Sequence, residues 1–196
     1  RDKTTDYTYD SYYLYPATVT NALSQATAYT YDYSIGKPKQ VTLPNTRVFQ
    51  TVYDALDRVK EEKQPDLTTP STLVTKTAYV YTDQTIGNKI QKTDSLDGSV
   101  TADTYTYTDG FDRPIQIRKE TEDSYSVSDT VYNNVEQVYK QSLPYISSGS
   151  SKTSATTTSS LLATYSYDSI YRVTTTVNAA GTISYAYDDW KTIVTD

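Results

Sequence analysis

The side chains of this sequence that could take part in acid–base chemistry are almost all carboxylates. The chain contains no histidine and no cysteine, which excludes Ser-His-Asp triads, Cys-His pairs and metal sites built on imidazole or thiolate. Paired carboxylates remain as candidates, at Glu61/Glu62, Asp109/Asp112 and Asp188/Asp189. We interpret each pair as part of a turn or of a solvated strand face, so we predict no catalytic residue and no enzyme.

A calcium loop needs carboxylates at alternate positions and a glycine bend. The stretch Asp94-Ser95-Leu96-Asp97-Gly98 comes nearest to this pattern, but it is too short and lacks the final glutamate. We interpret it as a plain turn. No glycine-rich phosphate loop is present either, and the sequence therefore predicts neither a metal nor a cofactor.

A charged pair recurs at a fixed spacing. The pattern Asp-x-x-x-Arg occurs three times, and a neutral version runs from Asn133 to Gln137. The pairs could form a ligand site repeated along a surface. Alternatively, each aspartate caps a turn and each arginine packs its stem over a tyrosine ring. We favour the second interpretation for all three pairs, Asp54/Arg58, Asp109/Arg113 and Asp168/Arg172.

The elements that position these pairs are marked by tyrosine. The pattern Tyr-x-Tyr-Asp and its degenerate copies recur eight times, with the second position of each copy at residues 9, 31, 53, 81, 107, 132, 167 and 187. The intervals of 20 to 35 residues are typical of a repeat architecture. The predicted repeat residues are Tyr29, Tyr31, Asp32, Tyr53, Asp54, Arg58, Tyr105, Tyr107, Asp109, Arg113, Tyr165, Tyr167, Asp168, Arg172, Tyr185, Tyr187 and Asp188.

Each copy reads as a β-hairpin. Alternating tyrosines point to one face of a strand, and the aspartate ends the strand by accepting backbone N–H groups in an Asx-turn. Four or five loop residues then connect to an antiparallel return strand, which closes at a Pro or Gly turn. One hairpin would be marginal, but eight together could hold a sheet. The sequence predicts an all-β fold of consecutive antiparallel hairpins.

Composition agrees with this fold and excludes some partners. The chain has 22 tyrosines among 196 residues, and tyrosine favours strands. The net charge of −6 and the scattered lysines and arginines argue against nucleic-acid binding. No apolar run reaches the length of about 18 residues that a membrane span needs.

The segment 146–160 breaks the repeat period. It is a low-complexity stretch of serine and threonine, and we expect it to be a protruding loop, the most mobile and most easily cleaved part of the chain. The same repeat resumes beyond it, so residues 1–196 are predicted to be one repeat region. The absence of methionine, even at position 1, suggests a fragment of a longer chain. Strand-like ends without proline predict edge-to-edge self-association.

These residues resemble the Rhs/YD-repeat family, which includes bacterial Rhs proteins, the B and C components of insecticidal toxin complexes, and the teneurin shell. The best matches are 51–66, 105–119 and 165–183, and the resemblance runs from about residue 5 to 190. The glycine that precedes arginine in the family repeat is replaced by Asp57, Asp112 and Tyr171. We therefore expect an uncommon backbone conformation at these positions.

The resemblance implies a spiral sheet that forms part of a hollow β-cocoon, or shell. In that role the chain would be a structural segment, with the remainder of its own Rhs-type chain and an enclosed C-terminal toxin or other cargo polypeptide as partners. It would be secreted or lie at the cell surface. The sequence has no Asp-Pro dipeptide, so the family's cleavage region is not expected within it. The alternative is a cell-surface adhesin or carbohydrate-binding module, because exposed tyrosine rows suit the faces of glycans.

Overall fold

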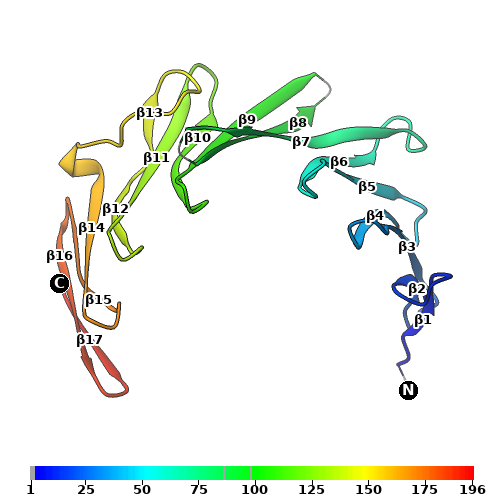
Figure 1. The fold of residues 1–196 in the computed structure, drawn as a ribbon, viewed down its shortest axis with the longest axis horizontal. Coiled ribbons are helices and arrows are strands. Elements are labelled where there is room, and N and C mark those ends of the chain that lie inside the picture. The colour runs from blue at the N-terminus through cyan, green and yellow to red at the C-terminus, as the bar shows by residue number, and fades with distance from the viewer. Residues whose placement is uncertain (1–2, 86, 98) are drawn as a thin grey trace. The chain divides into compact units, whose positions relative to one another are not determined.

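A computed structural model describes residues 3–85, 87–97 and 99–196 of the chain. The described part is almost entirely β-structure, with one short 3₁₀ helix, η1 (Ser159–Leu161) (Figure 1). The strands are β1 (Asp6–Tyr9), β2 (Pro16–Thr20), β3 (Ala26–Asp32), β4 (Lys37–Thr42), β5 (Val48–Tyr53), β6 (Val59–Pro65), β7 (Leu73–Asp83), β8 (Asn88–Asp97), β9 (Val100–Thr108), β10 (Pro114–Glu120), β11 (Tyr125–Tyr132), β12 (Val138–Ser142), β13 (Tyr145–Ser147), β14 (Leu162–Tyr167), β15 (Val173–Asn178), β16 (Gly181–Asp188) and β17 (Lys191–Thr195).

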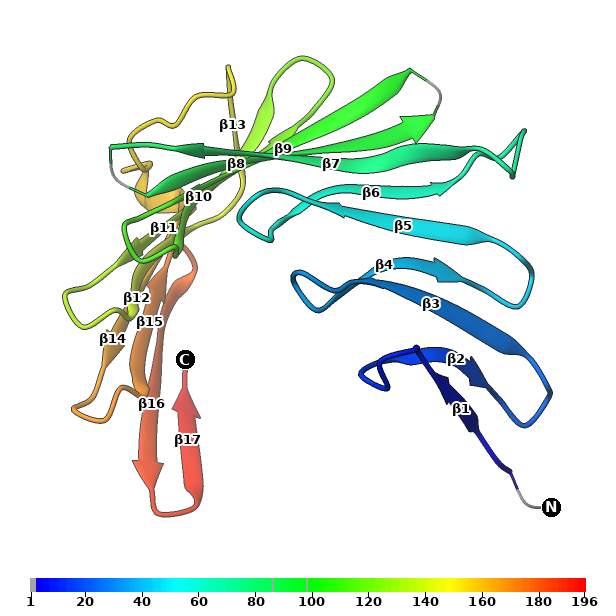
Figure 2. The ribbon, with the colours of Figure 1, turned by 45° about the vertical axis from the view of Figure 1, so that its right-hand side comes forward.

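The chain forms two compact units. The first comprises residues 1–80 and 92–101, and the second comprises residues 81–91 and 102–196. In the first unit, β1 to β7 pair consecutively and antiparallel. In the second, β9 to β12 pair consecutively, β12 then pairs with β14, and β14 to β17 continue the meander. Figure 2 shows the successive hairpins of each unit. The prediction of an all-β chain of antiparallel hairpins is confirmed.

The strand residues alternate as the tyrosine pattern requires. In β3, Thr27, Tyr29 and Tyr31 are half-buried while the residues between them are exposed. In β16, Ile183, Tyr185 and Tyr187 alternate in the same way. Because successive side chains of a strand point to opposite faces, one face of each hairpin carries the aromatic rings. Tyrosine supplies the apolar area that aliphatic residues supply in most sheets.

Deep burial is concentrated in the second unit. Among the described residues of the first unit only Pro65 and Thr77 are buried. In the second unit, β9, β10 and β11 bury a cluster that is mainly polar, with Arg118 and Val127 fully inaccessible to solvent. The other members of this cluster are Tyr105, Tyr107, Thr108, Gln116, Asp129 and, on β12, Ser142.

The serine- and threonine-rich segment lies over this cluster. It begins in β13, which pairs with β11, and ends at η1; it is the yellow stretch between β13 and β14 in Figure 1. We call residues 147–156 the strap. Side chains of β9, β10 and β11 hydrogen-bond to the strap at several points. Small residues bury little apolar area, but their backbone groups can satisfy buried polar side chains.

Candidate functional site: the aspartate turns and the polar cluster

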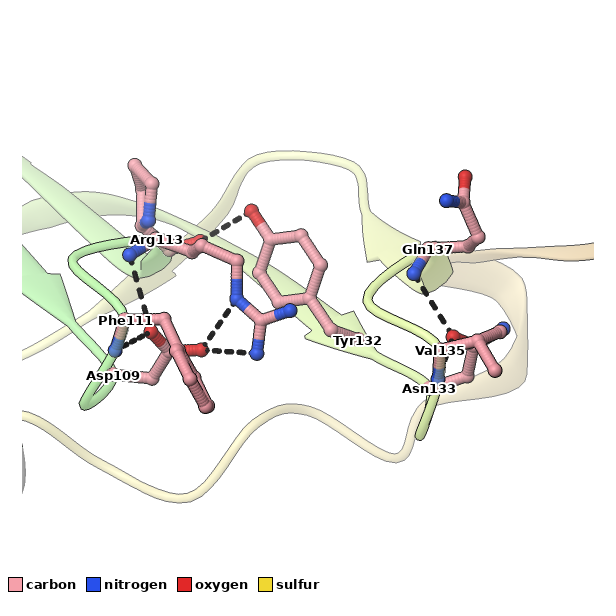
Figure 3. Close-up of polar contacts among 8 residues, drawn as sticks. Asp109, Phe111, Arg113, Tyr132, Asn133, Val135 and Gln137 are labelled. Atoms are coloured by element: carbon pink, nitrogen blue, oxygen red, sulfur yellow. Dashed lines mark hydrogen bonds and ion pairs between the residues drawn. The ribbon is translucent and has the colours of Figure 1, made fainter. Parts of the chain in front are cut away.

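Three aspartates organise the turns that follow β5, β9 and β14. Asp54 Oδ1 accepts hydrogen bonds from the backbone N–H groups of Leu56 and Arg58 at 2.8 and 3.0 Å. Its Oδ2 accepts the Arg58 Nε–H at 2.8 Å. Asp109 with Arg113 and Asp168 with Arg172 repeat this geometry, with Nε–Oδ2 distances of 2.8 and 2.7 Å. Figure 3 shows the Asp109 turn beside its neutral counterpart at Asn133. The carboxylate thus fixes both ends of a five-residue turn.

The fourth residue of each turn has a left-handed backbone. The φ angle is +60° at Asp57, +59° at Asp112 and +66° at Tyr171, so the uncommon conformation expected at these three positions is confirmed. Glu136 in the Asn133 turn has a φ of +67°. A residue at positive φ in this place forms a bulge that suits the twist of a hairpin. The conformation disfavours residues other than glycine, and the aspartate hydrogen bonds offset that cost.

The turn geometry holds the aspartate pKa values below their usual range. For Asp168 the largest cause is the hydrogen bond from the Arg172 backbone N–H, which lowers the pKa. Desolvation by burial opposes this effect, and the hydrogen bond from the Arg172 side chain lowers the pKa further. For Asp54 and Asp109, desolvation raises the pKa, but the combined hydrogen bonds from the turn and its arginine outweigh it. All three carboxylates are therefore ionised and engaged, which suits a structural role better than proton transfer.

We expect Asp168→Asn to reduce the acid sensitivity of the second unit. A depressed pKa contributes stability above the unfolded value of about 3.9, and this stability is lost as pH falls through the folded value. The amide keeps the Oδ1 acceptor but cannot titrate or pair with Arg172. Urea midpoints should therefore be lower for the variant at about pH 7 and converge with wild type near about pH 2. Asp188→Asn is the matched control, because Asp188 ends the same tyrosine pattern without an arginine four residues on. An equal difference at both pH values would contradict the prediction.

Two asparagines use the same turn without a charge. Asn133 Oδ1 accepts the N–H groups of Val135 and Gln137 at 3.0 and 2.9 Å, as Figure 3 shows. Asn21 does the same for Leu23 and Gln25 in the turn between β2 and β3. The Asn21 turn was not predicted from the sequence, although Asn21-x-x-x-Gln25 repeats the spacing of the neutral version at Asn133.

The second tyrosine of a repeat is tied to the preceding hairpin. Its hydroxyl donates to a backbone carbonyl at or next to the start of that hairpin's return strand. Examples are Tyr53 to Pro38 at 2.8 Å and Tyr187 to Val173 at 2.7 Å. The other tyrosines that do so are Tyr31, Tyr132 and Tyr167, which bond to Pro16, Pro114 and Val138. Burial is the main reason that the pKa values of Tyr31, Tyr53 and Tyr167 lie above the ordinary value.

Cations of one turn stack on the tyrosine of the next repeat. The guanidinium carbon of Arg113 lies 4.4 Å from the Tyr132 ring centroid, and that of Arg172 lies 4.2 Å from Tyr187. Lys37 takes the same place over Tyr53 at 5.4 Å. Arg113 and Arg172 therefore each bind the aspartate of their own turn and the tyrosine ring of the following repeat. We call this arrangement, aspartate turn plus following tyrosine, the inter-repeat clamp.

We expect Tyr187→Phe to lower the free energy of unfolding by about 0.5–1.5 kcal/mol, because it removes one hydrogen bond and leaves the Val173 carbonyl without that donor. The ring and its stacking on Arg172 remain, so the hydroxyl alone is tested. Tyr139→Phe is the control: Tyr139 is 42% exposed, and its ring also lies beneath a cation, that of Lys140. Chemical denaturation followed by circular dichroism would measure both, and equal losses would contradict the clamp.

The remaining predicted repeat residues take other positions. Tyr29, Tyr165 and Tyr185 are half-buried on their strands, and the Tyr165 hydroxyl donates to Gln141. Asp32 receives the Ser34 N–H and hydroxyl. Asp188 departs from the pattern: it is exposed and pairs with Lys191 across a two-residue turn.

The candidate carboxylate pairs take part in ion pairs. Glu61/Glu62 lie on β6, where Lys63 binds Glu61, and Asp109/Asp112 lie in a turn, where Arg113 binds Asp109. Of the stretch 94–98, Gly98 lies outside the described residues.

Tyr105 and Tyr107 belong to the buried polar cluster. The Tyr105 hydroxyl donates to Asp103 at 2.8 Å, and burial followed by that bond raises the pKa of Tyr105 strongly. Tyr107 donates to the carbonyl of Ser150 in the strap at 2.6 Å. Tyr107 thus bonds to the strap, where the second tyrosine of other repeats bonds to the preceding hairpin.

Arg118, Gln116 and Asp129 form the centre of this cluster. Asp129 accepts hydrogen bonds from Gln116 Nε2 at 2.7 Å and from the Tyr145 hydroxyl at 2.8 Å. Gln116 Oε1 in turn accepts from Arg118 Nη1 at 3.2 Å. An amide therefore links a buried guanidinium to a buried carboxylate. Sequence reasoning missed these residues, since each reads as an ordinary polar residue of a strand.

Within the described ranges 3–85, 87–97 and 99–196, no group of three His, Cys, Asp or Glu side chains could hold a metal ion. In the same ranges no helix has the length and apolar character to cross a membrane.

Comparison with known proteins identifies the fold. No protein-family model and no curated protein matches the sequence. Solved structures do match: TcdB2-TccC3-Cdc42 with a TM-score of 0.79 and 13% identity over 98% of this chain, and TcdB2-TccC3-TEV with 0.78 and 15% over 98%. A Photorhabdus luminescens Tc holotoxin pore matches with 0.75 and 15%, again over 98%. This chain has the fold of one segment of these toxin-complex chains.

The resemblance to the Rhs/YD-repeat family, which includes toxin-complex components, is thus confirmed at the level of the fold. The chain covers only 14 to 15% of the length of these three toxin-complex chains. The matched fold therefore corresponds to a limited part of each of them.

Proposed function

We propose that this chain is a wall segment of an Rhs-type shell that encloses a C-terminal toxin or other cargo polypeptide. The observation that carries the proposal is the match of 98% of the chain to toxin-complex structures at TM-scores of 0.75 to 0.79. In this role residues 1–196 are one repeat region of about eight repeats within a longer protein, and its partners are the rest of that protein and the enclosed polypeptide. The protein is secreted or lies at the cell surface.

The inter-repeat clamp supports a wall function. A sheet one layer thick has no opposite layer to bury its aromatic face, so each hairpin must be held by its neighbours. Asp109 fixes Arg113, Arg113 stacks on Tyr132, and Tyr132 bonds back to the Pro114 carbonyl. Each clamp joins one hairpin only to the next one along the chain. A sheet held by such clamps can therefore be lengthened by adding further hairpins, as in other repeat proteins.

The role is structural and not enzymatic in this proposal. The carboxylates of the Asp-x-x-x-Arg pairs are ion-paired at 2.7 to 2.8 Å. Their depressed pKa values make them poor proton donors or acceptors near neutral pH.

The carbohydrate-binding alternative finds less support. Stacking on sugars needs free aromatic faces, whereas the rings of Tyr132 and Tyr187 are covered by guanidinium groups. Tyr7, Tyr9, Tyr12 and Tyr13 are more than half exposed, but they lie at one end of the first unit and do not continue as a row through the repeats. Self-association through strand edges stays a prediction, which sedimentation of the purified chain would check.

The proposal is tested on the natural full-length protein. If this segment belongs to a closed wall, limited proteolysis of the native protein should leave a C-terminal cargo region intact. Weakening the aspartate turns, two of which belong to clamps, by Asp54→Ala, Asp109→Ala and Asp168→Ala together should make that region protease-sensitive at denaturant concentrations where wild type still protects it. Electron microscopy of the same sample should show hollow particles. Equal cleavage of the C-terminal region in native and clamp-deficient protein, or solid particles, would overturn the proposal.

A further inference from the structure

The strap is held mainly through its backbone, with additional hydrogen bonds to the hydroxyls of Ser147 and Thr153. Arg118 Nε and Nη2 donate to the carbonyls of Gly149 and Ser148 at 3.0 and 2.8 Å, and Tyr107 donates to Ser150 at 2.6 Å. Most strap residues nevertheless remain exposed, Ser148, Gly149 and Ser151 to Ala155 among them. Among them, the Thr153 hydroxyl also accepts hydrogen bonds from Arg118 Nη1 and Gln116 Nε2, both at 3.3 Å.

The second half of the strap is held in the same manner. The Thr153 N–H donates to Gln116 Oε1 at 3.0 Å, and the Thr153 carbonyl accepts from Gln116 Nε2 at 3.3 Å. Three residues later the Thr156 N–H donates to Asp129 Oδ2 at 2.8 Å. The side-chain amide of Gln116 therefore hydrogen-bonds to both the N–H and the carbonyl of Thr153, as the backbone of a neighbouring strand would.

From these contacts we infer that Tyr107, Gln116, Arg118 and Asp129 form a binding site for an extended polypeptide rich in serine, threonine and glycine, and that the strap is its tethered occupant. The site supplies three donors for successive carbonyls and two carboxylate or amide oxygens for N–H groups three residues apart. Serine and threonine suit the site because Arg118 also donates to the hydroxyls of Ser147 and Thr153, and glycine suits position 149 because its φ is +71°. Proline is excluded where the N–H groups of Thr153 and Thr156 are bound.

The site is separate from the clamps and does not depend on a shell role. Arg118 is fully buried, yet every hydrogen-bond acceptor of its guanidinium is a carbonyl or hydroxyl oxygen and not a carboxylate. Four of these five bonds go to the strap. If the strap leaves, a cation and several oriented polar groups are exposed on the sheet, and another extended segment would satisfy them.

The experiment releases the strap without shortening the chain. The double substitution Thr153→Pro and Thr156→Pro removes the two bound N–H groups, and a synthetic peptide with the sequence of residues 147–156 is then added in trans. We expect saturable binding of the peptide by isothermal titration, and no binding at about 1 mM by the unsubstituted chain, whose tethered strap competes at high effective concentration. Adding Tyr107→Phe to the double variant should weaken binding about 2- to 13-fold, the effect of one hydrogen bond.

A peptide with proline at both threonine positions is the matched control and should not bind. Equal binding of the two peptides, or no binding to a double variant that unfolds cooperatively, would overturn the inference. If the double variant does not fold, amide hydrogen exchange on the unsubstituted chain decides the question. The Thr153 and Thr156 amides should exchange at least about 100-fold faster than those of β10 and β11, because the strap opens without global unfolding. Equal rates would show that the strap is an inseparable part of the sheet and would refute the site.

Discussion

Replacing Arg118 by methionine is expected to lower the free energy of unfolding of the second unit by about 3–5 kcal/mol, the cost of removing one partner from a buried charged network. Arg118 is fully buried and makes five hydrogen bonds, to Gln116 and to four strap atoms. Methionine fills much of the same volume, so little of the loss comes from a cavity. The carbonyls of Ser148 and Gly149 lose their donors, so the strap is held less firmly over the cluster.

Lys119→Met on the same strand is the control for this substitution. Lys119 is exposed, and a surface change of this kind shifts stability by less than about 0.5 kcal/mol. Urea unfolding followed by circular dichroism would compare the two variants with wild type. If Arg118→Met lost less than about 1 kcal/mol, the strap bonds would contribute little, and the cluster would be held by its apolar neighbours such as Val127.

The turns and hairpins could be predicted because their signals are local. Asp54 binds groups two and four residues away, so the whole interaction lies within five residues of sequence. Tyr-x-Tyr places both rings on one face through the strand geometry alone. The unusual backbone at Tyr171 could be expected for the same reason, since it occupies the glycine position of the repeat that this chain resembles.

The strap and its site could not be predicted because their contacts are distant in sequence. Arg118 and Gly149 are 31 residues apart, and Gln116 and Thr153 are 37 apart. A serine- and threonine-rich segment carries no apolar pattern from which packing can be deduced. The sequence therefore contains no sign that the backbone groups of this segment bind the buried polar side chains. The stacking of Arg113 was expected on some tyrosine, but nothing in its own turn indicates Tyr132 of the next repeat.

Gly87→Ala should cause the other large loss of stability. Gly87 lies in the turn before β8 with a φ of +72°, and a Cβ atom there would lie 2.1 Å from the Thr108 carbonyl oxygen and 2.6 Å from that of Asp109. Both obstacles are backbone atoms, which cannot rotate away. The Asn88 N–H also bonds to Thr108 Oγ1 at 2.9 Å, and its side chain to Asp112 at 2.8 Å. The glycine therefore lets this turn rest directly against the aspartate turn that follows β9.

The expected loss is about 2–4 kcal/mol, of which about 1–2 kcal/mol is the cost of the left-handed conformation for alanine and the rest comes from separating the two turns. Gly110→Ala is the matched control, because Gly110 lies in that same aspartate turn, and a Cβ there would meet nothing within 4 Å. Thermal unfolding of both variants would measure the difference, and loss of the Asn88 bonds should appear as shifted amide signals of Asn88 and Asp112. Similar melting temperatures for the two variants would contradict the prediction. They would show that the Gly87 turn can move to accept a Cβ without loss of stability, and that its contact does not support the Asp109 clamp.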